Sequence, residues 1–273
     1  MANRFEGRTV VVTGASSGVG AAAARRFAEE GARVVLAART AAALESVAKE
    51  IGDRAVVIPT DVSDPEQARA LVERAALEAG GIHVLVNNAG YNHRGAVESA
   101  DPDELMRIVD VNLKAPILLS RLALPQLLQQ KQGNIVNVAS IAGQIPLPHE
   151  ATYSATKFGL RAFSMALAEE LRDSSVRVSL VSPGPIDTGF ITRDLDNVPD
   201  VVFSQPMSSA DDVAEAILDC AHDGTLERTL PRLSGALATA GYLVPQLPRL
   251  LRPLLEQQGK RAKARFLEEH SAE

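Results

Sequence analysis

Tyr153 and Lys157 are the two side chains whose types and spacing most clearly suggest chemistry. A helix places residues four apart on the same face, so a helical segment at 153–157 directs the phenol and the ammonium to one place. Free tyrosine has a pKa of about 10, and a neighbouring cation favours the phenolate. Tyr153 beside Lys157 can therefore exchange a proton with a substrate oxygen near neutral pH. The alternative is an ordinary helical turn whose Lys157 faces water, because this spacing is common by chance.

A glycine-rich loop near the start of the chain predicts a site for a phosphate group. Residues 8–13 are a β-branched run typical of a buried strand, and residues 14–20 lead into an alanine-rich helix that ends at Gly31. Glycines let backbone N–H groups approach a pyrophosphate, and a helix N-terminus favours negative charge. The strand before the loop and the helix after it favour a nucleotide site over the alternative, a simple tight turn.

The second predicted strand, residues 33–38, bears on which nucleotide would bind. In a dinucleotide-binding unit, an acidic residue about 20 positions after the glycine loop holds the ribose 2′-hydroxyl. Ala38 stands at that position, and Arg39 follows it. With no carboxylate to repel a 2′-phosphate and a guanidinium nearby, NADP is better accommodated than NAD. The alternative is that Arg39 is a solvated loop residue.

The composition excludes several classes of function. The chain has 273 residues, a formal net charge of −6, no Trp and 4% aromatic residues, so neither charge nor stacking supports nucleic-acid binding. The single Cys220 excludes an internal disulfide and predicts a small buried hydrophobe on a helix. No metal site is predicted, because His93 and His149 stand in loops without ligand spacing. The polar first residues and the lack of a long apolar run predict no secretory signal, no transmembrane segment and a cytoplasmic location.

Strands and helices alternate along most of the chain. Further strands are predicted at residues 54–59, 82–86, 134–139, 177–181 and 227–230. Helices are predicted to start at a capping box that begins at Ser63 and at cap sequences that begin at Asp101 and Ser209. This alternation predicts an α/β fold, a single doubly wound (Rossmann) domain with a mostly parallel sheet of about seven strands flanked by helices.

One edge of the predicted sheet collects the unusual residues. Gly14, Asn87, Ser140 and Pro183 all lie at the C-terminal ends of predicted strands. Ligands of open α/β sheets bind at that edge. Asp61 follows a strand in the same way and can border a cofactor site, although it can equally be a turn residue.

A long helix predicted from Asp101 contains Asn112 and, four residues later, Pro116. Proline has no N–H group, so the carbonyl of Asn112 loses its usual helical donor and the helix is expected to kink. The carbonyl is then free to hold an ordered water for proton relay. The alternative is local strain without a function.

Taken in order, these features resemble the short-chain dehydrogenase/reductase family from residue 9 to about residue 188, roughly two-thirds of the chain. The resemblance rests on T-G-x-x-x-G-x-G at residues 13–20, N-N-A-G at 87–90, Asn112, Ser140, Y-x-x-x-K at 153–157 and P-G at 183–184. Each motif alone is common, whereas the set in this order is highly specific.

The resemblance implies an oxidoreductase that moves hydride between NADP or NAD and a carbonyl or secondary alcohol. Tyr153 would be the acid/base, and Ser140 would bond the substrate oxygen. Lys157 would lower the Tyr153 pKa and hold the nicotinamide ribose, and Asn112 would anchor a water of the proton path. The implied cofactor contacts are Gly14, Ser16, Ser17, Gly18, Val19, Gly20, Arg39, Asp61, Val62, Asn88, Ala89, Gly90, Tyr153, Lys157, Pro183, Gly184, Ile186 and Thr188.

The resemblance departs from the family pattern at one position. Many NADP-dependent members carry a basic residue just before the second glycine of the loop, and Ser17 stands there in this chain. Arg39 would therefore have to bind the 2′-phosphate alone or with a further partner. The resemblance also implies a homodimer or homotetramer built on the helices that contain Asn112 and Lys157.

Candidate residues for the substrate pocket lie at 91–94, 141–148 and 190–203. Their apolar members predict a moderately apolar small molecule: Ile145, Pro146, Leu147, Phe190, Ile191, Val202 and Phe203. The alternative is that these side chains only pack the loop. The predicted catalytic domain spans residues 1–230 and includes a substrate loop at 185–208.

Residues 231–273 are predicted to form a C-terminal helical extension. It is expected to act as a lid over the substrate cleft or as a subunit contact. A peripheral contact with a membrane surface is a weaker alternative, because Glu256, Glu268 and Glu269 dilute the basic residues of this segment.

A second function from another class is a dinucleotide-sensing protein that binds the cofactor without turnover. The intact set of Ser140, Tyr153 and Lys157 argues against it, because a sensor needs no proton donor.

Overall fold

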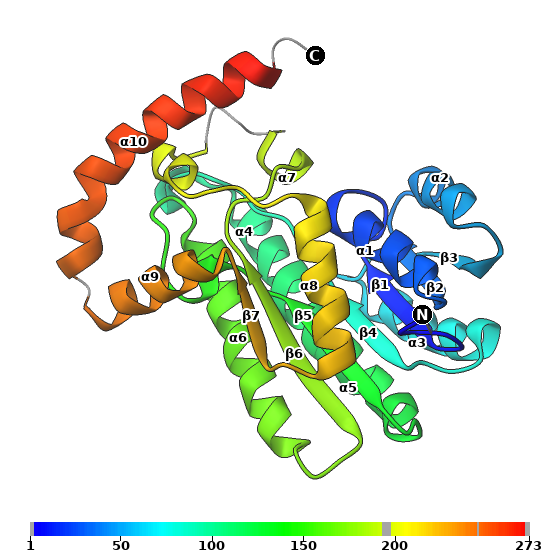
Figure 1. Ribbon diagram of the computed structural model, residues 1–273. Coiled ribbons are helices and arrows are strands. Elements are labelled where there is room, and N and C mark those ends of the chain that lie inside the picture. Colours follow the sequence, from blue (N-terminus) through cyan, green and yellow to red (C-terminus); the bar gives the residue numbers. More distant parts are fainter. Residues whose placement is uncertain (1–2, 193–197, 245, 271–273) are drawn as a thin grey trace.

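A parallel β-sheet of seven strands forms the centre of the molecule (Figure 1). The computed structural model describes residues 3–192, 198–244 and 246–270. The strands are β1 (Thr9–Thr13), β2 (Arg33–Ala38), β3 (Ala55–Pro59), β4 (Val84–Asn87), β5 (Gly133–Val138), β6 (Val176–Pro183) and β7 (Glu227–Leu230). Their order is β3-β2-β1-β4-β5-β6-β7, and all neighbours pair in parallel. The doubly wound parallel sheet predicted from the sequence is confirmed.

Helices cover both faces of this sheet, which explains why its central strands are rich in buried β-branched residues. On one face lie α1 (Gly18–Glu29), α2 (Ala41–Ile51) and α8 (Ala210–Asp223). On the other lie α3 (Pro65–Ala79), α5 (Ala115–Leu128) and α6 (Ala151–Glu170). Cys220 of α8 is buried in the first of these cores as predicted, and burial raises the pKa of its thiol to about 12.

The helix starts follow the predicted capping residues with one correction. Ser209 caps α8, and Asp101 caps α4 (Pro102–Val109), both through their side chains. The capping box predicted to begin at Ser63 is wrong, because Asp64 is the cap of α3. The Asp64 carboxylate accepts the N–H groups two and three residues later. Pro65 explains the shift, since its fixed φ suits the first helical position and makes the residue directly before it the cap.

Between α4 and α5 the chain makes a π-helical turn over Asp110–Lys114. The N–H of Ala115 bonds to the carbonyl oxygen of Asp110, five residues earlier. The sequence predicted one long helix with a kink at Pro116, and the irregularity is instead a π turn that ends before this proline, in the first turn of α5. The turn contains Asn112, which is fully buried. π turns occur frequently at functional sites.

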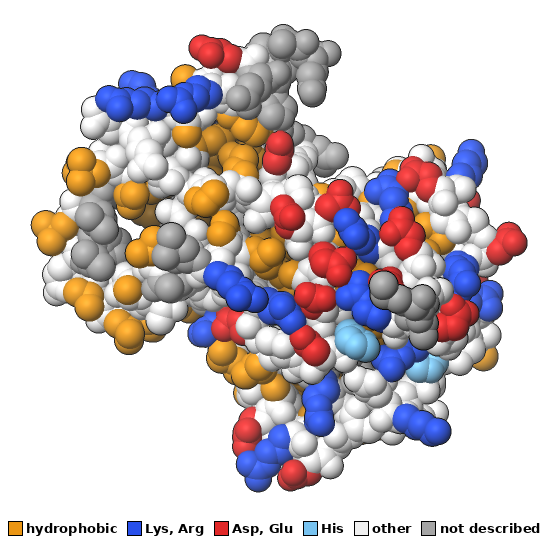
Figure 2. Space-filling model, in the orientation of Figure 1, with side chains coloured by type: hydrophobic (Ala, Val, Ile, Leu, Met, Phe, Trp, Pro, Cys, Tyr) orange, Lys and Arg blue, Asp and Glu red, His pale blue; other side chains and the backbone are white. Residues whose placement is uncertain are grey.

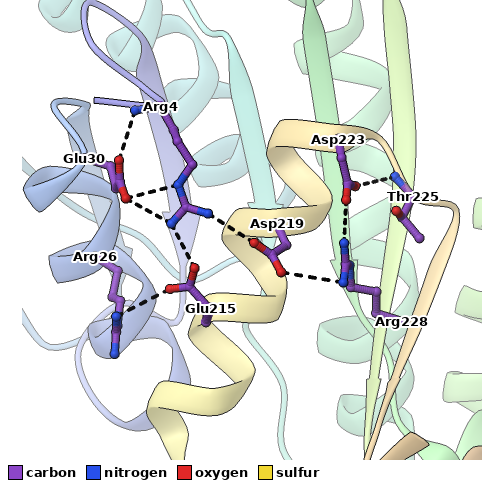
Figure 3. A network of polar contacts seen from close by, with 8 residues as sticks. All are labelled: Arg4, Arg26, Glu30, Glu215, Asp219, Asp223, Thr225 and Arg228. Atoms are coloured by element: carbon purple, nitrogen blue, oxygen red, sulfur yellow. Dashed lines mark hydrogen bonds and ion pairs between the residues drawn. The ribbon is translucent and has the colours of Figure 1, made fainter. Parts of the chain in front are cut away.

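A network of ion pairs fastens α8 to the start of the chain and to β7 (Figure 3). Arg4 donates to Glu30 after α1 and to Glu215 and Asp219 of α8, with N–O distances of 2.9–3.1 Å. Arg228 of β7 pairs with Asp219 from the other side. Arg4 precedes β1, so the network lies at the amino ends of the strands, opposite the glycine loop. It therefore has a structural role and takes no part in the site described below.

Two helices follow β7 and form the predicted C-terminal extension, α9 (Arg232–Leu243) and α10 (Gln246–His270). α10 packs on the 3-10 helix η6 (Asp200–Ser204): a Cβ on Gly259 would overlap the Asp200 carbonyl oxygen. The rings of Phe203 and Phe266 are 5.6 Å apart. The extension therefore covers the second half of the predicted substrate loop, of which residues 193–197 lie outside the described residues.

The outer curve of the extension carries hydrophobic side chains (Figure 2). The large exposed ones are Leu237, Tyr242, Leu243, Val244, Leu250 and Leu254. Among the helices of the described chain, none is both long enough and apolar enough to cross a bilayer. The division into a catalytic domain and an extension that acts as lid or subunit contact stays a prediction.

Thr13, the last residue of β1, ties the glycine loop to the loop after β4. Its Oγ1 accepts the N–H groups of Asn88 and Ala89, each at 3.0 Å. The Asn88 carboxamide donates back to the Thr13 carbonyl oxygen at 2.9 Å. Thr13 is almost completely buried, so water cannot replace these bonds. They fix the relative position of two loops that the chain separates by about 75 residues.

Replacement of Thr13 by Val keeps the shape of the side chain and leaves the partly buried N–H groups of Asn88 and Ala89 without their acceptor. We expect the free energy of unfolding, measured by urea denaturation, to fall by about 1–3 kcal/mol. Thr40→Val is the matched control, because Thr40 is exposed before α2 and its side chain makes no cap bond. Equal stability of the two variants would contradict the role given to Thr13.

Candidate active site

The carboxyl ends of β1, β4, β5 and β6 meet at one edge of the sheet and carry the residues singled out from the sequence. These strands are neighbours or near neighbours in the sheet, and all run in the same direction. Gly14 follows β1 directly, Asn87 ends β4, Ser140 lies two residues after β5, and Pro183 ends β6. The structure therefore brings the predicted residues together at the edge where ligands of such folds bind.

The glycine loop forms a tight cradle that fits a dinucleotide pyrophosphate. Gly14 and Gly18 have positive φ angles of 67° and 53°. A Cβ on Gly20 would overlap the carbonyl oxygen of Gly14, so only glycine permits this approach. α1 begins at Gly18 and directs its free N–H groups to this rim, as an anion requires.

An open groove of about 740 Å³ borders the cradle at Gly18 and Thr188 and continues along α1 to the start of α8, past Ala22, Arg26 and Asp211. Thr188 lies just before the short helix α7 (Gly189–Thr192). Gly18 and Thr188 were both predicted as cofactor contacts, and both line this groove. Ile186 pairs with Ser208, and the N–H of Gly184 donates to the Leu230 carbonyl, which fixes this loop at the end of β6.

Arg39 and Asp61 stand at the ends of the two neighbouring strands β2 and β3. Arg39 is exposed, and the Asp61 carboxylate accepts the N–H and hydroxyl of Ser63 at 3.0 and 2.6 Å. Burial alone would raise the Asp61 pKa, but the bonds from Ser63 and the positive charge of Arg39 hold this pKa below its ordinary value. Val62 beside it is buried. Arg39 and Asp61, both predicted to contact the adenosine part of the cofactor, therefore lie close together at the carboxyl ends of β2 and β3.

Gly90 joins the cofactor side of the edge to the catalytic side. A Cβ on Gly90 would lie 3.1 Å from the Asn112 Oδ1 and 3.7 Å from the Lys157 Nζ. The absence of a side chain at this position therefore allows the close approach to Asn112, and Lys157 lies at an ordinary contact distance from the same position. Because Gly90 lies between the glycine cradle and these two side chains, a single ligand bound along this loop can reach the cradle, Asn112 and Lys157.

Asn112 holds the next residue of that loop in place. Its Oδ1 accepts the Tyr91 N–H at 3.0 Å, and its Nδ2 donates to the Tyr91 carbonyl at 2.8 Å. Its Nδ2 also lies 3.5 Å from the hydroxyl of Thr156, which donates to the Tyr153 carbonyl at 2.7 Å. The side chain therefore has a positioning role that the sequence did not reveal. The proton-relay water expected on its backbone carbonyl stays a prediction.

Tyr153, Ser140 and Lys157 converge beside this loop. α6 presents Tyr153 and Lys157 on one face, and the Lys157 Nζ is 5.6 Å from the centre of the Tyr153 ring. The hydroxyl of Ser140 is hydrogen-bonded to the Tyr153 phenol and also accepts the Ala142 N–H at 3.1 Å. Tyr153 is 7% exposed and Lys157 is 5% exposed, so the alternative of a water-facing Lys157 is wrong.

The electrostatics of this group differ from the sequence prediction. Burial raises the Tyr153 pKa above its ordinary value, the charge of Glu150 raises it further, and the Ser140 bond and Arg94 only partly oppose them. Burial also lowers the Lys157 pKa to about 8, and its ammonium donates to the Val138 carbonyl at 2.9 Å. The expected lowering of the phenol pKa by the neighbouring ammonium is therefore absent in the protein alone.

The apolar candidates for a substrate pocket divide into two groups. Ile191 and Phe203 are buried with Val198 and pack against α10 side chains, so for them the alternative of loop packing is favoured. Ile145 and Leu147 are partly buried in the loop before α6, and Pro146 is exposed. The side chain of Phe190 lies outside the described part of the structure. His93 and His149 are exposed loop residues.

Sequence reasoning missed a buried ion pair next to Tyr153. Arg94 Nε lies 3.0 Å from the Glu150 Oε1, and the two side chains are only 6% and 5% exposed. No sequence signal could have found this pair, because its members stand 56 residues apart in two loops. It also missed Glu227 of β7, which accepts from Arg161, Gln144 and Ser182 below the site.

Known proteins of similar sequence and fold agree with this geometry. The family model for short chain dehydrogenase matches residues 8–198. An oxidoreductase of Staphylococcus saprophyticus is 38% identical over 189 residues, which cover 68% of this chain and 77% of the relative. One of Staphylococcus aureus is 36% identical over 212 residues, 77% of this chain and 89% of the relative.

Among solved structures, the 3-ketoacyl-(acyl-carrier-protein) reductase from Brucella melitensis complexed with NADH superposes with a TM-score of 0.77. It is 34% identical, and the match covers 84% of this chain and 99% of that one. The glycine cradle, the convergence of Ser140, Tyr153 and Lys157, and these matches lead to one conclusion. The chain is an NAD(P)-dependent oxidoreductase and belongs to the short-chain dehydrogenase family.

Proposed function

We propose that this enzyme transfers hydride between NADP and a carbonyl or secondary alcohol of a moderately apolar small molecule, with Tyr153 as the acid/base. The observation that carries the proposal is the contact of Gly90 with Asn112 and Lys157, together with the bond between Ser140 and Tyr153. A dinucleotide held by the glycine cradle would then place its other end beside the Tyr153 phenol and the Ser140 hydroxyl.

The catalytic residues divide the work between orientation and proton transfer. When bound, the nicotinamide group supplies or accepts the hydride. The Ser140 hydroxyl orients the substrate oxygen toward Tyr153, and the Tyr153 phenol gives its proton to that oxygen in reduction or removes it in oxidation. Lys157 stays mostly protonated at neutral pH with a pKa of about 8, so its ammonium can donate to a hydroxyl of the nicotinamide ribose. Asn112 holds the loop after β4 in register with α6.

The preference for NADP rests on charge at the end of β2. Arg39 is exposed where the 2′-phosphate of NADP would lie, and Ala38 offers no carboxylate for a 2′-hydroxyl. Asp61 is nearby, but its Oδ1 already accepts from Ser63 and its charge is opposed by those of Arg39 and Arg107. The Brucella reductase is complexed with NADH, so the proposed preference for NADP is argued from Ala38 and Arg39 of this chain and not from that neighbour.

The substrate side of the site combines apolar and polar groups. Ile145 and Leu147 are partly buried before α6. Asn92 follows Tyr91 in the loop after β4, and both polar atoms of its carboxamide are buried without a partner among the described residues. An unpaired buried amide is unfavourable, so its partner is expected to be a polar group of the substrate. The substrate would therefore carry a second oxygen or nitrogen besides the reacting carbonyl.

A homodimer or homotetramer stays the prediction from the family resemblance, and a cytoplasmic location stays the prediction from the sequence.

Tyr153→Phe removes the proton donor and keeps the ring. We expect kcat to fall by about 100-fold or more, while NADPH binding, followed by the rise in its fluorescence, stays within about threefold. Tyr242→Phe is the control, because Tyr242 is exposed on α9. Unchanged turnover in Tyr153→Phe would remove this residue from the mechanism. A protein that binds NADPH but turns over no ketone or alcohol even with Tyr153 intact would be a sensor.

Arg39→Asp replaces the proposed 2′-phosphate ligand by a group that repels it. We expect the ratio of kcat/KM for NADPH to that for NADH to fall by about 100-fold, since a charge-assisted contact becomes a repulsion. Arg33→Asp is the control, because Arg33 is exposed at the opposite end of the same strand. If both variants keep the parent ratio, Arg39 does not discriminate between the cofactors.

Asn92→Ala removes the unpaired amide. We expect KM for the substrate to rise about tenfold, with kcat and NADPH affinity little changed, because a ground-state hydrogen bond is lost. Asn3→Ala, at an exposed position far from the site, is the control. An unchanged KM for every substrate found by screening would show that Asn92 does not contact the substrate.

A further inference from the structure

The buried ion pair between Arg94 and Glu150 joins two segments that flank the Tyr153 phenol. Arg94 belongs to the loop after β4, and Glu150 directly precedes α6. The Gly95 N–H also donates to the His149 carbonyl at 2.9 Å, so the two segments are held by backbone and side chains at adjacent positions. His149 adopts a positive φ of 64°, an uncommon conformation for a residue other than glycine. The chain is therefore held in a strained turn where Glu150 meets Arg94.

This pair lies where its charges act on Tyr153. Glu150 directly precedes α6 and stands three residues before Tyr153 in the chain, and its charge interacts with the Tyr153 phenol. The negative charge of Glu150 raises the Tyr153 pKa, and the positive charge of Arg94 lowers it. In a site shielded from water, such interactions are much stronger than at the surface.

The other groups around the phenol are few in the described chain. On α6 itself, Lys157 places its ammonium 5.6 Å from the ring centre. The segment after β5 contributes the neutral Ser140 hydroxyl. The π turn contributes the neutral Asn112, whose carboxamide is engaged with Tyr91. Of the charges near the phenol, Glu150 is the one that opposes the phenolate.

We propose that Arg94 is a positioning residue that neutralises the buried Glu150 carboxylate, so that Glu150 can hold the loop after β4 against α6 without suppressing ionisation of the catalytic Tyr153. The proposal rests on the proposed function of Tyr153 as acid/base and extends it to the ion pair beside the phenol. It explains why both charges are buried together, since either alone would be unfavourable at this place.

The proposal requires opposite effects of the two neutral substitutions. Arg94→Gln removes the positive charge 3.0 Å from the Glu150 carboxylate and makes the phenolate harder to form. Glu150→Gln removes the opposing charge and leaves an amide oxygen that can still accept from the Arg94 Nε. The double variant removes both charges and returns the phenol close to its parent state. A merely structural pair would give losses of the same sign in every variant.

The decisive experiment is carbon NMR of protein labelled at the phenol carbon of tyrosine, with NADP⁺ bound. The chain has three tyrosines, and Tyr153→Phe assigns the signal. We expect the Tyr153 pKa to rise by about one unit in Arg94→Gln, to fall by about one unit in Glu150→Gln, and to return near the parent value in the double variant. The alcohol-oxidation profile of kcat/KM, which rises as the phenolate forms, should shift by the same amounts.

Controls separate this proposal from the proposed function and from misfolding. Arg74→Gln and Glu78→Gln break an exposed pair of the same types on α3 and should shift nothing. Arg94→Lys keeps the charge and should keep the parent pKa. If Arg94→Gln does not fold, Glu150→Gln still decides, because its phenol pKa must fall.

The proposal is overturned if the Tyr153 pKa in Glu150→Gln equals that of the parent protein, or if the pKa shifts in the same direction in both single variants. Because the NMR signal does not depend on turnover, this outcome is distinct from failure of Tyr153 as the acid/base, which would show as unchanged activity in Tyr153→Phe.

Discussion

Burial opposes ionisation of both members of the Tyr153–Lys157 pair, and the site depends on how the surrounding groups counter it. A buried phenol favours its neutral form, and a buried amine loses part of its affinity for a proton. In the protein without cofactor, the hydrogen bond from Ser140 and the charge of Arg94 lower the Tyr153 pKa. The charge of Glu150 raises it, as burial does. The phenol is thus kept protonated until further positive charge arrives. This state suits a proton donor for reduction and lets ligand binding control when the proton becomes mobile.

The parallel sheet makes this arrangement possible by bringing distant segments to one edge. Thr13 bonds the glycine loop to the loop after β4, and Asn112 bonds that loop to the π turn. Arg94 and Glu150 then connect the same loop to the start of α6. The segment from residue 88 to residue 95 therefore contacts the glycine loop, the π turn and the start of α6 in turn. A shift of this segment would change the cofactor cradle and the surroundings of Tyr153 together.

Much of the fold could be predicted because its signals are local. Strands show as β-branched runs, helix starts as caps, and the cradle as glycines between a strand and a helix. The cap of α3 was predicted one residue too early, since neighbouring polar residues compete for the cap position. The π turn at Asn112 was predicted as a kinked helix, since a π turn has no simple sequence pattern. The candidate catalytic residues were found through an ordered set of motifs. Arg94, Glu150 and Glu227 were not, because sequence does not reveal which charged residues are buried, and the phenol pKa depends on that burial.

The measurement closest to the centre of this account is the Tyr153 pKa in the free protein and with NADP⁺ bound, followed by NMR of the labelled phenol carbon. Burial predicts that in the free protein the signal does not titrate up to about pH 10. The positive charge of the oxidised nicotinamide predicts that the Tyr153 pKa falls by about two units or more in the complex. A phenol that titrates at the same high pH in both states would contradict the account, because cofactor binding would then leave the proposed acid/base unchanged.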